Sequence, residues 1–525
     1  MKKATLHTVL IITLISFNFT ACRDKNDLPK PKPTPSSHKV SPVSQFVYDG
    51  LSTYYLWNDE MKDKKPTEKD TDAKKYFQSV LYKTDIEHGW SRITDDVDAL
   101  LSGFEGESTD AFGFVPAALW ADKDKSAILG FVKYVYPNTP AANAGMKRGH
   151  VISKINGQNI TKSNFHILFG DNQKTTFTVL DQNYQNPKEI TIVPGKIETD
   201  PVLFSNVYEF DDKKIGYLFY TQFIYKYNNS LYKAFESFKQ AGITDLVVDL
   251  RYNHGGAVTS ASYLASLIAP RKVVEDKSTL AIMSYNEFLN ASFDKWYKEA
   301  EQKDKYKYDR KDYFGFFGKE QENPLGANLN LNKVYIIATD DSFSASELTT
   351  FCLRPYMEVV HIGRKTGGKY TASWTLHPYD SEKGQPIYDA NKMASKDKEI
   401  LKKWAMQPIV ARYTDKDGKD FIATNGLIPD FEIESQEYDT RSWKPIGDVE
   451  DYLFAKAISL ITGRPYNAAP LRSSSEKYIQ VDIPEPSIHK RIIKESVVLD
   501  NPKISPSELN ELLQLRRARI QEEEE

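Results

Sequence analysis

Residues 333–369 read KVYIIATDDSFSASELTTFCLRPYMEVVHIGRKTGGK, and this stretch decides the fold around it. It starts with a buried-strand pattern at Val334–Ala338, continues through a polar turn, and predicts a helix that opens at Ser344. The helix is expected to end near Arg354–Pro355, because proline cannot continue it and disfavours helical backbone at the residue before. A second strand at Val359–Ile362 and a glycine-rich turn follow. A strand that runs into a helix start sets hydroxyls beside free backbone N–H groups, so a nucleophile and an oxyanion hole can form together.

The same residues admit a simpler interpretation. Ser344 and Glu347 have the spacing of a capping box, which usually only fixes a helix start. A second motif favours chemistry, because DLRYNHGG at 249–256 directly follows a buried strand at Leu246–Val248. Adjacent glycines at the carboxyl end of a strand let the backbone aim an N–H group at a ligand, and sites in α/β sheets form at this edge.

Taken in order, the motifs DLRYNHGG (249–256), SFSASE (342–347) and GRKTGGK (363–369) resemble those of the C-terminal processing, or tail-specific, serine peptidases. The resemblance implies that Ser344 is the nucleophile and that Lys369, 25 residues further on, is the general base. It also implies a crotonase-like ββα peptidase core of the α/β type, with no cofactor and no metal.

The expected chemistry sets conditions on the base. A lysine can take the proton of a serine hydroxyl only while its amine is neutral, and the reference pKa of lysine is about 10.4. Burial in an apolar pocket can lower such a pKa by up to about 3–5 units. We therefore expect Lys369 to be enclosed, beside the Ser344 hydroxyl and without a carboxylate partner. The expected oxyanion donors are the N–H groups of Ala345 and of Gly255 or Gly256.

Three positions depart from the pattern of the family. Ser373 stands where the family commonly has a glutamine that orients the lysine, and its hydroxyl is a candidate replacement. Tyr370 follows the lysine in place of a common glycine, and His254 occupies a position where proline is frequent. A serine–histidine pair is conceivable, but His254 abuts the expected oxyanion loop, so we assign it to that loop or to a substrate subsite.

Composition bounds the function classes. The 525 residues are 40% hydrophobic and 27% charged, with a net charge of −3. This length suffices for several domains, each with its own core. The balanced charge gives no basis for nucleic-acid binding, which depends on clustered Lys and Arg.

The N-terminus has the features of an export signal over residues 1–21: a basic start, an apolar run centred on Val9–Phe17 that is too short to span a bilayer, and small residues before Cys22. This resembles a bacterial lipoprotein signal, in which Cys22 becomes the lipidated N-terminus. The alternative is an ordinary signal peptide with an incidental cysteine. Residues 22–42 are rich in Pro, Lys and Ser and predict a flexible tether. We expect an exported chain, lipid-anchored in a bacterial cell envelope and most simply in the outer membrane, on its periplasmic or surface face.

Two domains are expected before the core. Residues 43–103 show helical spacing of apolar residues and predict a small helical domain. Residues 104–200 change to short strands, and VYPNTPAANAGMKRGHVISKINGQNI (135–160) resembles a PDZ domain of bacterial proteases. The resemblance implies that the backbone at Phe112, Gly113 and Phe114 captures a peptide terminus and that the peptide adds as a strand. The alternative is that this glycine turn only closes the barrel.

Residues 203–445 alternate strands and helices as α/β layers do. A Lys-, Asp- and Tyr-rich insertion at 270–331 is expected to hold helices around 285–302 and to cover the active-site cleft. DKDG at 415–418 is assigned to a hairpin turn, because the later ligands of a calcium-binding EF-hand are missing. Residues 446–525 are expected to hold a helix at Asp451–Thr462 and a charged tail that is a solvated helix end or disordered. The fold class is α+β multidomain.

The sequence therefore predicts a serine endopeptidase with a Ser–Lys dyad that cuts unfolded or C-terminal segments of exported proteins through an acyl-enzyme. Its partners would be a protein or peptide substrate and, through the lipid, a membrane. The alternative is a lipid-anchored peptide-binding protein on the same scaffold with little or no hydrolysis. The presence of Ser344 and Lys369 favours the peptidase, and Ser373 keeps the binding protein open. Neither the natural substrate nor the oligomeric state is fixed by these patterns.

Overall fold

The computed structural model describes residues 40–121, 124–433, 440–466, 479–480, 497–499 and 503–525. Val40–Glu525 forms one compact unit. The predicted signal peptide, Cys22 and most of the predicted tether fall in Met1–Lys39, outside the described residues, so the structure does not bear on them.

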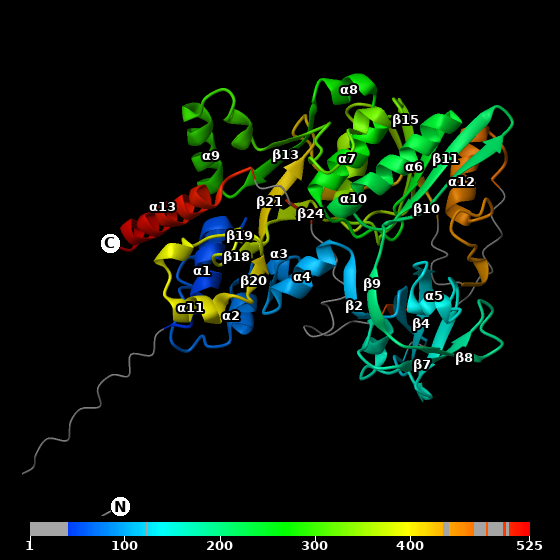
Figure 1. Ribbon diagram of the computed structural model, residues 1–525, viewed down its shortest axis with the longest axis horizontal. Coiled ribbons are helices and arrows are strands. Elements are labelled where there is room, and N and C mark those ends of the chain that lie inside the picture. The colour runs from blue at the N-terminus through cyan, green and yellow to red at the C-terminus, as the bar shows by residue number, and fades with distance from the viewer. Residues whose placement is uncertain (1–39, 122–123, 434–439, 467–478, 481–496, 500–502) are drawn as a thin grey trace, which may run out of the picture. The chain divides into compact units, whose positions relative to one another are not determined.

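The central sheet has the strand order β10-β11-β12-β15-β16-β22. Figure 1 labels three of these strands, β10, β11 and β15. β10 and β11 form an antiparallel hairpin, and each later strand lies parallel to its neighbour. Because parallel strands need crossover connections, the carboxyl ends of β12, β15 and β16 meet at one edge of the sheet, where the glycine and serine motifs lie. The strands are β10 (Val202–Phe210), β11 (Lys213–Tyr220), β12 (Asp245–Asp249), β15 (Lys333–Ala338), β16 (Glu358–Gly363) and β22 (Phe431–Glu432).

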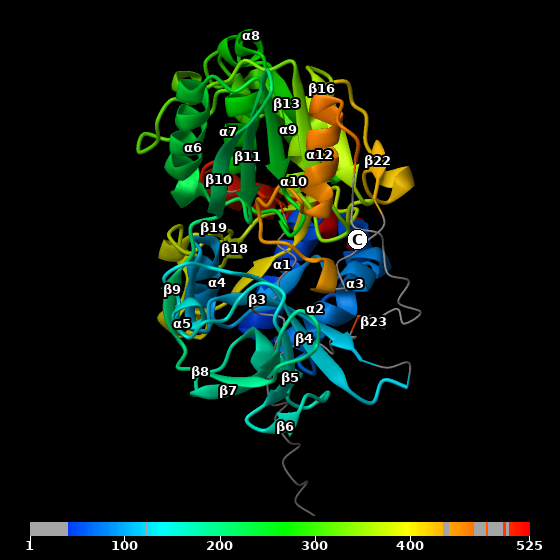
Figure 2. The same cartoon turned by 90° about the vertical axis from the view of Figure 1, so that its right-hand side faces the viewer.

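Helices cover both faces of this sheet. One face carries α6 (Asn228–Ala241), α7 (Val258–Ile268) and α10 (Ala345–Leu353), and the other carries α12 (Tyr452–Thr462), as Figure 2 shows. Side chains alternate along a strand, so Val248 packs in the core with the first set of helices while Val247 packs in the core with α12. These helices and strands confirm the predicted α/β layers around the serine motif.

The predicted PDZ-like domain forms a sheet of order β23-β3-β4-β5-β7-β8. The ring of Phe112 stacks on that of Phe114, and both lie edge-on to Phe177. Gly113 has φ +94°, and a Cβ there would lie 2.2 Å from Thr139 Cβ. The loop is thus anchored in the core of its own domain, and peptide capture by its backbone stays a prediction. The elements are β2 (Glu107–Ala111), β3 (Phe114–Trp120), β4 (Ile128–Val135), α5 (Pro140–Asn143), β5 (Val151–Ile155), β6 (Gln158–Asn159), β7 (Thr175–Leu180), β8 (Lys188–Ile192), β9 (Gly195–Glu198) and β23 (Ile479–Gln480).

The N-terminal helical region is not self-contained. Its helices are α1 (Pro42–Tyr54), α2 (Ala73–Val80), α3 (Lys83–His88) and α4 (Val97–Phe104). Segments from much later in the chain pack against them. A four-stranded sheet has the order β1-β20-β18-β19, formed by β1 (Arg92–Thr94), β20 (Ala405–Gln407), β18 (Leu376–His377) and β19 (Gln385–Pro386). α11 (Ser395–Leu401) lies near this sheet (Figure 1).

The charged tail agrees with its prediction only in part. α13 (Pro506–Glu524) lies beside α1 (Figure 1), and the Tyr54 hydroxyl donates to the Leu509 carbonyl at 2.6 Å. Leu509, Leu512 and Leu513 are buried, so the helix is docked along one face, whereas residues 521–525 are exposed and form the predicted solvated helix end. The parts of the predicted tail at 467–478, 481–496 and 500–502 lie outside the described residues. The three leucines form an apolar stripe at helical spacing. The prediction missed this stripe because the tail was assessed by its overall content of charged residues.

The insertion contains the expected helix and two unexpected strands, β13 and β14. α9 (Glu287–Glu299) lies within the predicted range, and α8 (Arg271–Glu275) precedes it. A second sheet has the order β14-β13-β21-β17-β24, formed by β13 (Thr279–Tyr285), β14 (Lys311–Tyr313), β17 (Thr371–Ser373), β21 (Ile409–Thr414) and β24 (Val497–Val498).

The predicted hairpin at 407–422 is wrong. β21 pairs with β13 and with β17, strands that are far away in sequence, because those neighbours complete a larger buried sheet. The turn at 415–418 itself is present, since Asp415 Oδ1 accepts the N–H groups of Asp417 and Lys419 at 2.9 Å each.

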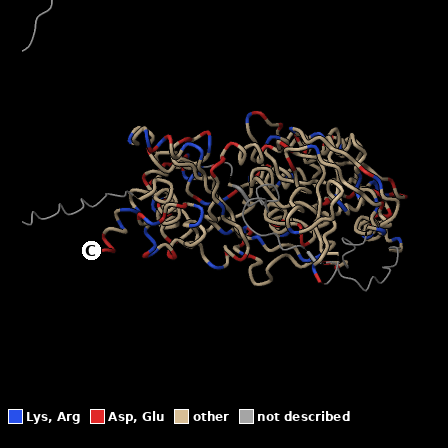
Figure 3. The backbone as a smooth tube through the Cα atoms, turned by 90° about the horizontal axis from the view of Figure 1, so that it is seen from below, with Lys and Arg blue, Asp and Glu red and all other residues tan. Residues whose placement is uncertain are grey.

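Charged side chains of both signs are interspersed along the described chain (Figure 3). Among the described helices none has the length and hydropathy needed to cross a membrane. Within the same residues no group of three or more His, Cys, Asp and Glu side chains is placed to hold a metal ion.

Candidate active site

The turn that carries Ser344 is joined to the segment 249–256 by hydrogen bonds. The Thr339 hydroxyl donates to the Arg251 carbonyl at 2.6 Å, and the Ser342 hydroxyl donates to the Leu250 carbonyl at 2.7 Å. The Asn253 carbonyl accepts both the Phe343 N–H at 3.1 Å and the Ser346 hydroxyl at 2.9 Å. The structure therefore brings together two of the three motifs as a single rigid edge.

Ser344 has an unusual backbone conformation for a residue with a side chain. Its φ is +62° and its ψ is −113°, at the junction between the turn and α10. A non-glycine residue in such a region typically costs about 1–3 kcal/mol and persists only where its surroundings enforce it. The Ser344 hydroxyl is buried and makes no hydrogen bond among the described residues. The capping-box geometry is present as well, since the Ser344 N–H donates to Glu347 Oε2 at 2.8 Å, so the cap and an available hydroxyl occur together.

Glu347 connects the residue of the predicted nucleophile with that of the predicted base. Its Oε2 accepts the backbone N–H of Ser344 and that of Lys369, each at 2.8 Å. Its Oε1 accepts the N–H of Gly368 at 2.8 Å and the hydroxyl of Thr366. Burial raises the pKa of Glu347, whereas the hydrogen bonds from these four donors lower it. One carboxylate oxygen thus accepts the N–H groups of two residues, Ser344 and Lys369, that lie 25 positions apart in the sequence.

Tyr413 makes a second connection between the same two residues. Its hydroxyl lies 3.3 Å from the carbonyl oxygens of both Ser344 and Lys369. Tyr413 belongs to β21, which also pairs with β17, the strand that begins just after Lys369. The geometry of the serine and lysine backbones is therefore fixed from two sides.

The side chain of Lys369 lies in a buried pocket to which the N-terminal region contributes. Lys369 is 0% exposed, and its Nζ lies 6.0 Å from the centre of the Trp90 ring. Burial raises the pKa of Asp85, while hydrogen bonds from Ser91 and Tyr55 and the charge of Lys369 lower it. A buried carboxylate is thus close enough for Lys369 to act on it. The structure agrees with the prediction that Lys369 is enclosed, and the absence of a carboxylate partner stays a prediction.

The expected oxyanion donors lie next to Ser344 but are not equivalent. A Cβ on Gly255 would lie 2.7 Å from Ser344 Cβ and 2.9 Å from Ala345 N, so only glycine fits against the nucleophile turn. The Gly255 N–H donates to Asn253 Oδ1 at 2.8 Å and is already engaged. A Cβ on Gly256 would lie 2.1 Å from the backbone oxygen of Phe223, so this position also accepts only glycine. Of the predicted donors, the N–H groups of Ala345 and Gly256 are the better candidates.

The remaining predicted positions fall around this centre. Ser373 is fully buried on β17, and its carbonyl accepts the N–H of Leu499 at 3.1 Å. The His254 ring lies edge-on to Phe343, and its Nε2 is 3.8 Å from Asp341 Oδ1. His254 therefore belongs to the loop beside the site, as the sequence suggested, and its role in substrate binding stays a prediction.

Comparison with known proteins agrees with this geometry. The family model "Peptidase family S41" matches residues 214–433, and "Peptidase S41 N-terminal domain" matches residues 43–92; together they span more than half of the chain. The chain belongs to the S41 peptidases. A PDZ domain model matches residues 131–166 of this S41 chain.

Individual relatives are distant. A solved structure, a putative S41 protease from Bacteroides fragilis NCTC 9343, matches with a TM-score of 0.59 at 24% identity and covers 80% of this S41 chain and 97% of that chain. A probable CtpA-like serine protease of Staphylococcus aureus (strain bovine RF122 / ET3-1) is 24% identical over 343 residues, 64% of this chain and 55% of that protein. Its counterpart in strain N315 is 24% identical over 342 residues. The S41 chain thus spans only about 55% of the length of these curated relatives.

A buried ion network supports the S41 core below the site. Arg251 is fully buried and its guanidinium contacts the carboxylates of Asp249 and Asp451 at 2.7 and 2.6 Å. Asp451 also caps α12, since its Oδ1 accepts the N–H groups of Leu453 and Phe454 at 3.2 Å each. Sequence reasoning missed this network and the role of Glu347. Charged residues inside otherwise apolar strand ends were the available signal, because such residues are buried only when paired.

The PDZ-like domain of the S41 chain contacts the catalytic edge directly. Lys133 on β4 forms an ion pair with Asp341, three residues before Ser344. Burial by itself would raise the pKa of Asp341, but the charges of Lys133 and His254 bring it below its usual value. Arg148 donates to the Tyr252 hydroxyl at 3.0 Å. The glycine segment is therefore held from the PDZ side as well.

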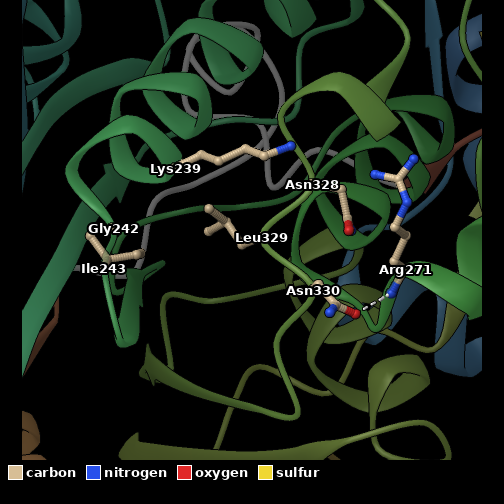
Figure 4. A pocket seen from close by; sticks show the side chains of 7 residues that line it. All are labelled: Lys239, Gly242, Ile243, Arg271, Asn328, Leu329 and Asn330. Atoms are coloured by element: carbon tan, nitrogen blue, oxygen red, sulfur yellow. Dashed lines mark hydrogen bonds between the residues drawn. The ribbon is translucent and has the colours of Figure 1, made fainter.

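A surface hollow of about 290 Å³ lies away from these S41 motifs (Figure 4). The Arg271 N–H donates to Asn330 Oδ1 at 2.7 Å across its floor. None of its lining residues belongs to the motifs, so it is not the catalytic centre. It is lined by Lys239, Gly242, Ile243, Arg271, Asn328, Leu329 and Asn330.

Proposed function

We propose that this chain is a serine endopeptidase that uses Ser344 as nucleophile and Lys369 as general base. The single observation that carries the proposal is the Glu347 carboxylate, whose Oε2 holds the backbone N–H groups of both residues at 2.8 Å. A capping interaction alone would not bring a lysine from a glycine turn to the start of this helix. The S41 family match and the serine proteases among its relatives support the same activity.

The proposed reaction uses groups of this chain alone. Neutral Lys369 takes the proton of the Ser344 hydroxyl as its oxygen bonds to the peptide carbonyl carbon. The N–H groups of Ala345 and Gly256 stabilise the charge that develops on the carbonyl oxygen. The C–N bond then breaks, Lys369 returns its proton to the departing amine, and an ester on Ser344 remains. Water, deprotonated by Lys369, attacks the ester carbonyl carbon. The bond from that carbon to Ser344 Oγ breaks, Lys369 returns the proton to Oγ, and the new carboxyl end is released.

We further propose unfolded or C-terminal segments of exported proteins as substrates, and lipidation at Cys22 as the anchor. The PDZ domain match supports capture of an extended peptide as an added strand. Lipidation is tested by metabolic labelling with a fatty acid, because Cys22→Ser would abolish incorporation into an authentic lipoprotein. Labelling of the Cys22→Ser chain at the original level would rule out this anchor.

Activity is tested by comparing the intact chain with Ser344→Ala and Lys369→Ala on an unstructured reporter peptide. Both substitutions are expected to reduce hydrolysis to background, whereas peptide binding by Ser344→Ala persists. Mass spectrometry of the products identifies the cleaved bond and separates internal from terminal cleavage. Full activity of Lys369→Ala would remove the proposed base.

A second candidate is a peptide-binding protein with little or no hydrolysis. It is favoured by one observation, that both Ser344 and Lys369 are 0% exposed, so no peptide reaches them in this conformation. Background-level cleavage by both the intact chain and Ser344→Ala, with retained peptide binding, would leave this candidate alone.

A further inference from the structure

The buried active site raises the question of what occupies the place of a substrate. Ser344, Lys369 and Ser373 are each 0% exposed. Hydrolysis requires a peptide carbonyl within bonding distance of the Ser344 hydroxyl, so part of the chain has to give way to the peptide. An extended peptide binds most readily by adding a strand to a free sheet edge beside such a site.

The edge beside the proposed base is filled by the chain itself. β17 begins two residues after Lys369 and pairs on one side with β21. On its other side it pairs in parallel with β24, with Ala372 opposite Val497 and Ser373 opposite Val498. The Leu499 N–H extends this pairing by donating to the Ser373 carbonyl at 3.1 Å.

The corresponding edge of the PDZ-like domain is filled in the same way. β3 begins immediately after Phe112 and Gly113, the loop expected to capture a peptide terminus, and one of its edges pairs with β4. The other edge pairs antiparallel with β23, with Trp120 opposite Ile479 and Leu119 opposite Gln480. The pairing lies at the end of β3 away from the loop, so a peptide that adds antiparallel along this edge from the loop, as PDZ ligands do, would meet β23 as it lengthens.

Both added strands come from the stretch of chain after α12, which is anchored downstream. Lys503 lies 3.7 Å from Asp309, and Arg517 on α13 pairs with Asp49 on α1 at 2.6 Å. Tethering makes the pairing intramolecular and raises its effective concentration to the millimolar range. Each pairing is only two or three residues long, and a backbone hydrogen bond contributes about 0.5–1.5 kcal/mol net, so a longer peptide can replace it.

We propose that Ile479–Gln480 and Val497–Leu499 occupy in cis the two strand edges that a substrate peptide uses, and that substrate binding requires their displacement. This inference rests on the proposed function for the identity of the edges. It makes the described conformation a self-occupied state, in which the chain acts as its own weak competitive ligand.

The test measures peptide binding without hydrolysis. In the full chain carrying Ser344→Ala, Leu499→Pro removes the N–H that donates to Ser373, whereas the matched control Leu499→Ala keeps it. A labelled unstructured peptide with a free carboxyl end is the probe. We expect Leu499→Pro to bind it about 2- to 10-fold more tightly than Leu499→Ala, as loss of one backbone hydrogen bond predicts. Equal affinities of the two folded variants would overturn the proposal.

Hydrogen exchange provides a measurement that needs no folding-sensitive variant. Saturating the Ser344→Ala chain with the same peptide is expected to speed exchange of the amides at 479–480 and 497–499 while the amides of α13 keep their protection. Unchanged exchange at both segments in the peptide-bound chain would refute displacement. Cleavage by the unsubstituted chain reports only on the proposed function, so failure of one proposal is distinguishable from failure of the other.

Discussion

At the scale of single residues, the candidate site depends on backbone positions more than on side-chain pairs. Ser344 is held at φ +62°, and its N–H shares an acceptor atom with that of Lys369. Gly255 lies so close that a Cβ would be 2.7 Å from Ser344 Cβ. Activity should therefore respond strongly to changes that leave both proposed catalytic side chains in place.

The first residue-scale prediction concerns Glu347. Glu347→Gln replaces one acceptor oxygen by an NH₂ group and leaves buried N–H donors facing another donor. We expect a loss of about 1–3 kcal/mol in the free energy of unfolding. The peptidase rate should fall about 100-fold, because small displacements of reacting groups have effects of this size. Urea unfolding and kcat/KM are measured together. Thr366→Val, which removes only one of the four donors, is the milder control, and full activity of Glu347→Gln would show that the connection is dispensable.

The second residue-scale prediction uses two glycines with similar backbone angles. Gly255 has φ +104° and Gly145 has φ +83°, but a Cβ on Gly145 meets no atom within 4 Å. Both alanine substitutions should cost about 1–2 kcal/mol of stability from the backbone. Only Gly255→Ala should also abolish hydrolysis, since its methyl group displaces the nucleophile turn. Thermal unfolding and turnover separate the two effects, and comparable activity in both variants would contradict the role given to Gly255.

At the scale of elements, the buried His361 on β16 connects β15, the strand before the serine motif, with Asp430. Its Nε2 lies 3.2 Å from the Ala338 carbonyl of β15, and the His361 N–H donates to Asp430 at 2.8 Å. Burial lowers the pKa of His361 to about 4. The ring is therefore neutral in the folded chain at pH values where an unfolded chain would begin to protonate it.

This shift predicts the pH dependence of stability. Because the folded-state pKa lies below the unfolded value of about 6.5, the stabilisation is full above pH 6.5 and is lost as the pH falls towards 4. At pH 5 the loss from this group should be on the order of 2 kcal/mol. Urea unfolding at pH 7 and pH 5 measures it, and His361→Gln should show a smaller difference between the two. If the free energy of unfolding falls equally between pH 7 and pH 5 in the unsubstituted chain and in His361→Gln, a group other than His361 causes the acid sensitivity.

At the scale of the whole molecule, the pocket of the proposed base is completed by a distant part of the chain. Asp85 and Trp90 come from the N-terminal region, while Lys369 lies in the core, more than 270 residues later. The N-terminal region in turn is closed by α13 and β20. Correct folding of both ends of the described chain is thus a condition for the site.

The resulting prediction is a shift in the pH profile of activity. Asp85→Asn removes a negative charge that favours the protonated form of Lys369, so the acidic limb of the kcat/KM profile should move to lower pH. An opposite charge nearby commonly has effects of about 1 unit or more in such profiles. Asp98→Asn, at an exposed ion pair with Lys383, is the control and should leave the limb in place. If the acidic limb of the kcat/KM profile lies at the same pH in the unsubstituted chain, in Asp85→Asn and in Asp98→Asn, then Asp85 does not influence the proposed base.

Local patterns in the sequence were sufficient for the elements and for the order of the motifs. The strand before Ser344, the helix after it and the α/β alternation follow from periodicity and from proline and glycine positions, which act over a few residues. The resemblance of three motifs, in their order and spacing, to those of a peptidase family singled out Ser344 and Lys369 as residues worth testing.

Only the tertiary structure decided how those residues are used. Three features depend on contacts between residues far apart in the chain: Glu347 joins two motifs, α13 is docked, and β23 and β24 fill two sheet edges. The engagement of the Gly255 N–H by Asn253 is local, but no sequence pattern indicated it. Each such contact depends on which buried donors and apolar faces remain unsatisfied after local structure forms, and that balance is set by the whole fold.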